Sequence, residues 1–135
     1  MMRAGVVLLL ISPLAIAADG SWSNQSFGGT ITRENQTLKS KPVQSPSPLS
    51  PGTVATRVYW KINTSGPTPV GFRIRLCSAT RCLKLPGLAG EMALFADIPA
   101  GGPFRFEYAS PKGDTFNYPL TVMSNQMTVS YSSQH

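Results

Sequence analysis

Few side chains in this 135-residue chain have the chemistry of a catalyst or a metal ligand. The chain contains two cysteines, Cys77 and Cys82, and its one histidine, His135, is the last residue. A histidine at a chain end is a poor general base for activating a nucleophile. Two thiols and this histidine are also fewer ligands than a zinc site needs. We therefore expect no catalytic residue, no metal site and no cofactor, and the protein is not expected to be an enzyme.

Carboxylates are the remaining groups that could catalyse a reaction. Four of them, Glu91, Asp97, Glu107 and Asp114, lie in the C-terminal part and show no spacing that pairs them. Because the two carboxylates of a glycosidase can lie far apart in sequence, a hydrolase stays as an alternative that the scarcity of histidine disfavours.

The N-terminal residues 1–17 have the pattern of a cleaved signal peptide. Arg3 supplies the positive charge, an apolar run follows, and residues 15–17 (Ala-Ile-Ala) resemble a cleavage site. A membrane anchor is the alternative, but a span needs about 20 apolar residues and Pro13 interrupts this run. We expect an exported single domain at residues 18–135 with no integral membrane span.

Export would place the two cysteines in an oxidising compartment. An even cysteine count in an oxidising compartment predicts one disulfide, Cys77–Cys82. Four residues separate the pair, so it is not a C-x-x-C redox motif. The spacing suits two strand ends that face each other across a short hairpin loop, and the disulfide would then staple that hairpin.

The elements that must position these residues are expected to be short strands. The chain has twelve glycines and twelve prolines, which disfavour helices, so a helical bundle is not expected. Period-2 alternation of apolar and polar residues predicts strands at 53–62, 71–77, 82–85, 91–96, 103–109, 120–123 and 127–131, with weaker candidates at 21–27 and 29–37. Residues 40–51 read as a Pro/Ser-rich loop. The expected fold is all-β, a small antiparallel β-sandwich (Ig-like or related) with one disulfide-stapled hairpin.

The strand 53–62 is expected to bury one side and expose the other. Its buried side would be Val54, Thr56, Val58, Trp60 and Ile62. If this strand pairs with 71–77 through the Gly-Pro turn between them, their outward faces align. Cysteines in register would also set Arg75 opposite Lys84. The candidate partner-binding face is then Arg57, Tyr59, Lys61, Arg73, Arg75 and Lys84.

Positive charge is concentrated in the same part of the chain. The formal net charge is +6 although only 13% of residues are charged. Between Glu34 and Glu91 there is no acidic residue, and the cations in this window are Lys39, Lys41, Arg57, Lys61, Arg73, Arg75, Arg81 and Lys84. An unrelieved cationic strip predicts an anionic partner, and a merely solvated basic face is the alternative. Nucleic acid is not expected, since an exported protein rarely meets it.

Several motifs resemble the FlhE family of periplasmic flagellar proteins. They are GPTP at 66–69, GFRIRLCS at 71–78, RC at 81–82, VMSNQ at 122–126 and GSW at 20–22. The resemblance spans most of residues 20–131, and the arginine-flanked cysteine pair is its most specific part.

This resemblance implies a small periplasmic β-sandwich encoded with the flagellar export apparatus. It implies an accessory factor, chaperone-like or plug-like, that limits proton leakage through the flagellar type III export apparatus. The implied partner is a flagellar export, rod or basal-body protein, and Cys77 and Cys82 match the family's disulfide. The alternative function is a peptidoglycan- or polysaccharide-binding module, which needs exposed aromatic rings such as Tyr59 and Trp22.

Overall fold

The computed structural model describes residues 19–94, 97–113 and 119–133. Within these ranges the chain forms nine β-strands and no helix, and the expected all-β fold is confirmed. No helix in this part of the chain is long and apolar enough to span a membrane. The expected signal peptide at 1–17, His135 and the end of the expected strand 91–96 fall outside the described residues.

The strands follow one another in chain order with mostly short connections. They are β1 (Gly20–Ser26), β2 (Gly29–Ile31), β3 (Thr37–Lys39), β4 (Thr53–Thr64), β5 (Arg73–Cys77), β6 (Cys82–Leu85), β7 (Ala89–Ala93), β8 (Arg105–Ala109) and β9 (Leu120–Ser133). The two separate strands expected at 120–123 and 127–131 are one continuous strand, β9.

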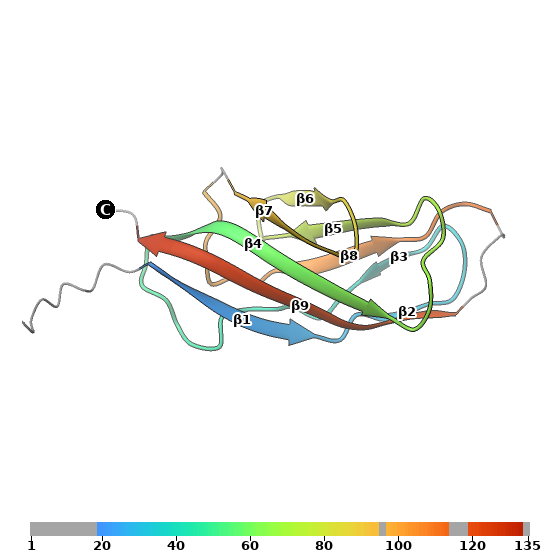
Figure 1. Ribbon diagram of the computed structural model, residues 1–135, viewed down its shortest axis with the longest axis horizontal. Coiled ribbons are helices and arrows are strands. Elements are labelled where there is room, and N and C mark those ends of the chain that lie inside the picture. The colour runs from blue at the N-terminus through green and yellow to red at the C-terminus, as the bar shows by residue number, and fades with distance from the viewer. Residues whose placement is uncertain (1–18, 95–96, 114–118, 134–135) are drawn as a thin grey trace, which may run out of the picture.

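Two antiparallel sheets face each other. Sheet A has the order β1-β9-β4-β7, with β2 also paired to β9, and sheet B has the order β3-β8-β5-β6. The long strands β4 and β9 run side by side through the middle of sheet A (Figure 1). Each sheet therefore has one face in the core and one face toward solvent, the arrangement of a β-sandwich.

The core fills with alternate residues of both sheets. Sheet A contributes Val58, Trp60 and Val129, and sheet B contributes Leu76 and Phe106, all of them buried. This burial requires that the neighbours of these residues along each strand point outward, because successive side chains of a strand alternate between faces. The outward faces of the two sheets are thus determined by the same alternation that builds the core.

A β-bulge in β4 changes which residues are buried. Ala55 lies opposite Tyr131 and Arg57 opposite Ser130, so Thr56 is an extra residue without a partner across the ladder. Thr53 and Ala55 are buried before the bulge, whereas Val58, Trp60 and Ile62 are buried after it. The expected burial of Val54 and Thr56 is therefore wrong, since a strict period of two cannot pass through a bulge.

The Pro/Ser-rich residues 40–51 form an ordered connection along the edge of sheet B. Val43 is buried and exchanges two backbone hydrogen bonds with Phe104, at 2.7 and 2.8 Å. The hydroxyl of Ser40 accepts a hydrogen bond from the backbone N–H of Phe106 at 3.0 Å. These bonds continue the pairing of β3 with β8 beyond the end of β3 and satisfy backbone groups that prolines would otherwise leave unpaired.

A buried polar link joins the two sheets through the core. Asn125 of β9 is fully buried, and the hydroxyl of Tyr108 on β8 donates a hydrogen bond to its Oδ1. The Nδ2 of Asn125 donates to the carbonyl and the hydroxyl oxygen of Ser26, each at 3.1 Å. Burial raises the pKa of Tyr108, so its phenol stays protonated and remains a donor. Because these hydrogen bonds satisfy the Asn125 side chain, β9 can point a polar residue into the core and remain one continuous strand.

Candidate functional site

The expected single strip of cations does not exist, because its two halves lie on different sheets. β4 pairs with β9 and β7 in sheet A, whereas β5 pairs with β6 and β8 in sheet B. The expected pairing of 53–62 with 71–77 is therefore wrong. The outer face of sheet A carries Arg57, Tyr59 and Lys61, and the outer face of sheet B carries Arg73, Arg75 and Lys84.

The physical reason lies in the connection between β4 and β5. Residues 65–72 include two prolines and lead from sheet A to sheet B, so they do not form the tight two-residue turn that favours a hairpin. β4 also finds a longer partner in β9, with which it pairs from Thr53 to Thr64. Alternation shows which residues share a face of a strand, but it does not choose the neighbouring strand.

The outer face of sheet B gathers more cations than the sequence led us to expect. We call this set the basic face: Lys39, Arg73, Arg75, Lys84 and Arg105, all of which are exposed. One row across β3, β8, β5 and β6 consists of Lys39, Glu107, Arg75 and Lys84, in that order. Lys39 and Arg105 were not among the expected site residues. The alternation in 103–109 predicts that Arg105 points outward. Only the pairing of β8 with β5 shows which cations lie beside it.

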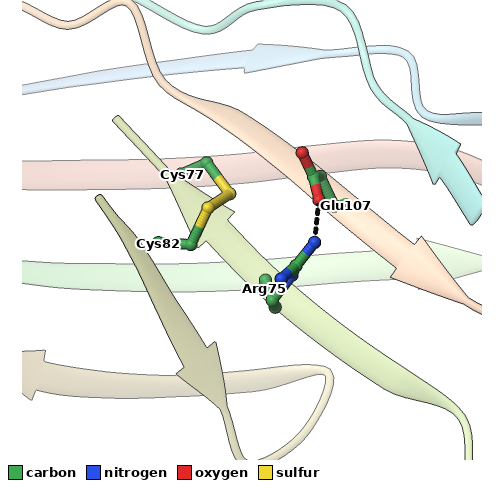
Figure 2. Close-up of polar contacts among 4 residues, drawn as sticks. All are labelled: Arg75, Cys77, Cys82 and Glu107. Carbon is green, nitrogen blue, oxygen red and sulfur yellow. Dashed lines mark hydrogen bonds and ion pairs between the residues drawn. A yellow bond between two sulfur atoms is a disulfide. The ribbon is translucent and has the colours of Figure 1, made fainter. Parts of the chain in front are cut away.

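One carboxylate partly neutralises the basic face. The Arg75 guanidinium donates a hydrogen bond to Glu107, and the two side chains form an ion pair (Figure 2). The Glu107 side chain is only 13% exposed, against 53% for Arg75, so the carboxylate lies low on the sheet and the cations project beyond it. The assumption that the strip has no acidic relief is wrong at this position. The basic face still holds five cations and one carboxylate.

The disulfide lies on the same face. Cys77 and Cys82 stand opposite each other at the end of the β5–β6 hairpin and are joined, so the expected disulfide and the expected register of Arg75 opposite Lys84 are confirmed. Figure 2 shows the bridge beside the Arg75–Glu107 pair. The two sulfurs and the Glu107 carboxylate lie within 4.8 Å of one another. Because both sulfurs are bonded to each other, this group offers a metal only one ordinary ligand, the carboxylate.

The outer face of sheet A is far less charged. Arg57 forms a loose ion pair with Glu91 at 3.8 Å, and both side chains are well exposed, so the pair adds little stability. A polar groove of about 500 Å³ runs over β1, β9 and β4. We define this polar groove by the outward residues Ser23, Gln25, Tyr59, Lys61, Gln126 and Thr128. A hollow on the basic face, beside Arg73 and Glu107, is smaller, about 190 Å³.

The aromatic residues named for polysaccharide binding have different positions. Trp22 is only 7% exposed and donates its indole N–H to the carbonyl of Ala100 at 2.8 Å, so it belongs to the core. Tyr59 is 39% exposed and lines the polar groove. Of these two rings, only that of Tyr59 is exposed enough to stack on a sugar.

Comparisons with known proteins identify close relatives over nearly the whole chain. The family model described as "Flagellar protein FlhE" matches residues 28–132. Flagellar protein FlhE of Salmonella typhimurium is 39% identical over 132 residues, which cover 96% of this chain and 99% of that protein. Flagellar protein FlhE of Escherichia coli K12 is 35% identical over 128 residues, covering 93% and 97% respectively.

A solved structure agrees with the fold. The chain in "Crystal Structure of FLHE" superposes with a TM-score of 0.77 at 38% identity. The match covers 85% of this chain and 98% of that one.

Proposed function

Because this chain belongs to the FlhE family of flagellar proteins, we propose that it acts in the periplasm as a chaperone-like or plug-like factor that limits proton leakage through the flagellar type III export apparatus. A flagellar accessory role follows from the family itself. The proposal adds a compartment, a binding face and a physical mechanism.

The observation that supports the proposal is the basic face. Its cations project from a four-stranded sheet whose β5–β6 hairpin is held by the disulfide. Arg75 and Lys84 stand directly opposite each other, and like charges so placed are destabilising, although the Glu107 carboxylate partly offsets the charge of Arg75. An anionic partner would relieve this repulsion when it binds. The partner is therefore an acidic surface of a flagellar export, rod or basal-body protein.

The mechanism follows from seating such a face over a proton path. A β-sandwich bound to an acidic surface displaces the water through which protons move. The guanidinium and ammonium groups of the basic face also raise the electrostatic energy of a proton in front of them, as cationic residues do in pores that exclude protons. Both effects slow leakage and neither needs a catalytic group.

The test measures cytoplasmic pH in cells that are assembling flagella, with the medium more acidic than the cytoplasm. Deleting the gene should lower the cytoplasmic pH, and the wild-type gene should restore it. The variant Arg73→Glu/Lys84→Glu should fail to restore it, because it reverses two exposed cations while leaving the Arg75–Glu107 pair in place. The matched control is Lys112→Glu, which reverses an exposed cation outside the basic face and the polar groove and should restore the pH fully.

Two results would defeat the proposal. An unchanged cytoplasmic pH together with normal swarming in the deleted strain would remove the proton-leak role. Equal rescue by the basic-face variant and the wild type would remove the basic face from the mechanism.

A further inference from the structure

The polar groove of sheet A has a regular arrangement of side chains that the proposed function does not use. In one row across β4, β9 and β1 lie Tyr59, Thr128 and Ser23. In the next row lie Lys61, Gln126 and Gln25. The groove's volume of about 500 Å³ falls inside the range of about 300–1,000 Å³ that is typical of ligand clefts. The groove thus combines a flat aromatic ring with a parallel line of amides ending in a cation.

The polar groups of the second row are available to a ligand. The side chains of Gln25, Gln126 and Lys61 make no hydrogen bond to any residue in the ranges 19–94, 97–113 and 119–133. Lys61 likewise takes no part in either ion pair found in the described chain, Arg57–Glu91 and Arg75–Glu107. Each glutamine offers donors and an acceptor, and the lysine offers a positive charge. By contrast, Ser23 and Thr128 already share a hydrogen bond at 2.6 Å.

The position of the groove favours a sugar chain over a peptide. An extended peptide is usually read by the free backbone groups of an edge strand. The floor of the groove includes β9 and β4, which pair with neighbours on both sides, so their ladder groups are already used. Recognition here must come from side chains: an aromatic face for stacking, amides for hydroxyl or acetamido groups, and a cation for a carboxylate.

We propose that the polar groove of sheet A is a binding site for a glycan chain of N-acetylated sugars that carry carboxylates, the chemistry of peptidoglycan. Tyr59 stacks on one sugar ring, Gln25 and Gln126 bond the acetamido and hydroxyl groups, and Lys61 pairs with a carboxylate. This site goes beyond the proposed function and does not rest on it. It would hold the protein at the cell wall while the basic face, on the opposite side of the sandwich, stays free.

The test uses residues 18–135, the expected exported domain, with purified sacculi and two soluble probes. One probe is a muropeptide oligosaccharide that bears carboxylates, and the other is an N-acetylglucosamine tetramer that bears none. Tyr59→Ala should weaken binding of both probes about tenfold, because both lose the stacking contact. Lys61→Ala should weaken only the muropeptide, by about fivefold, because only that probe has a carboxylate to pair. The matched control is Lys112→Ala, which removes an exposed lysine outside both the polar groove and the basic face and should change neither affinity.

Melting temperatures equal to that of the wild type would show that each variant is folded. The proposal fails if the wild type is not retained by sacculi and binds neither probe. It also fails if Tyr59→Ala binds as well as the wild type, or if Lys112→Ala loses as much affinity as Lys61→Ala, since the effect would then be one of net charge. If an acidic peptide released the bound protein from sacculi and the muropeptide did not, the groove would be assigned to a protein partner instead. None of these outcomes alters the cytoplasmic pH test of the basic face.

Discussion

Replacing Tyr108 with phenylalanine removes a single hydroxyl from the buried link between the sheets. The ring stays in place against Phe72 and Phe106, so the change leaves no cavity apart from the lost oxygen. What it leaves is the Oδ1 of fully buried Asn125 without its donor. An unsatisfied buried acceptor costs about 1–3 kcal/mol. For a domain of this size that corresponds to a fall in melting temperature of roughly 4–12 °C.

The double-mutant cycle with Asn125→Ala separates this bond from general packing. Asn125→Ala breaks three hydrogen bonds and opens a small cavity, so it should cost more than Tyr108→Phe. Adding Tyr108→Phe to Asn125→Ala should then cost little, because the donor has already lost its acceptor. We expect a coupling energy of about 1–2 kcal/mol from urea unfolding curves.

The same pair has a signature at high pH. Because burial raises the pKa of Tyr108, its phenol ionises in the unfolded chain, near pH 10, before it does in the folded protein. The contribution of the neutral phenol to stability is fully present below pH 10 and is lost as the pH rises above it. At pH 11 the stability advantage of the wild type over Tyr108→Phe should have fallen by about 1.4 kcal/mol. The buried link would be refuted if the free-energy costs of Tyr108→Phe and Asn125→Ala were additive and the stability difference between the wild type and Tyr108→Phe did not change with pH.

Other predictions concern the staple and the close contact beneath β9. Replacing both Cys77 and Cys82 with alanine should cost about 2 kcal/mol in urea unfolding, since only a short loop is closed, and a free energy of unfolding equal to that of the wild type would contradict the stapling role. Gly28→Ala should destabilise the protein by about 1–3 kcal/mol, because the added Cβ would lie 2.4 Å from the Cγ1 of Val122 and 2.9 Å from its backbone oxygen. Gly66→Ala is the control, since nothing lies within 4 Å of its added Cβ, and equal melting temperatures for the two variants would argue against this contact.

Local features of the chain were predictable, and the assignment of strands to sheets was not. The alternation around Ile74 and Leu76 and the four residues between the cysteines were enough to predict the β5–β6 hairpin and its register. Nothing local reveals that β4 prefers β9, which lies more than 50 residues further along the chain. Thr56 carries no mark of a bulge, because a bulge is a property of two paired strands and not of one.

The candidate site shows the same division. That Arg73, Arg75 and Lys84 share an outward face followed from alternation and the cysteine register. Their separation from Arg57 and Lys61, and the approach of Glu107 to Arg75, depend on pairings between distant strands. The cations between Glu34 and Glu91 were therefore expected to share one face, which they do not. Arg105 lies outside this stretch of sequence and was missed.

Photocrosslinking in intact cells tests most directly whether the basic face binds a flagellar partner. A photoreactive residue at Thr37, which lies in the row of Arg73 on the outer face of sheet B, reports on the basic face, and one at Tyr59 reports on sheet A. We predict that position 37 crosslinks to an export, rod or basal-body protein with an acidic surface, and that Arg73→Glu/Lys84→Glu abolishes this product. Protein crosslinks that arise only from position 59, or products from position 37 that survive both charge reversals, would contradict the account.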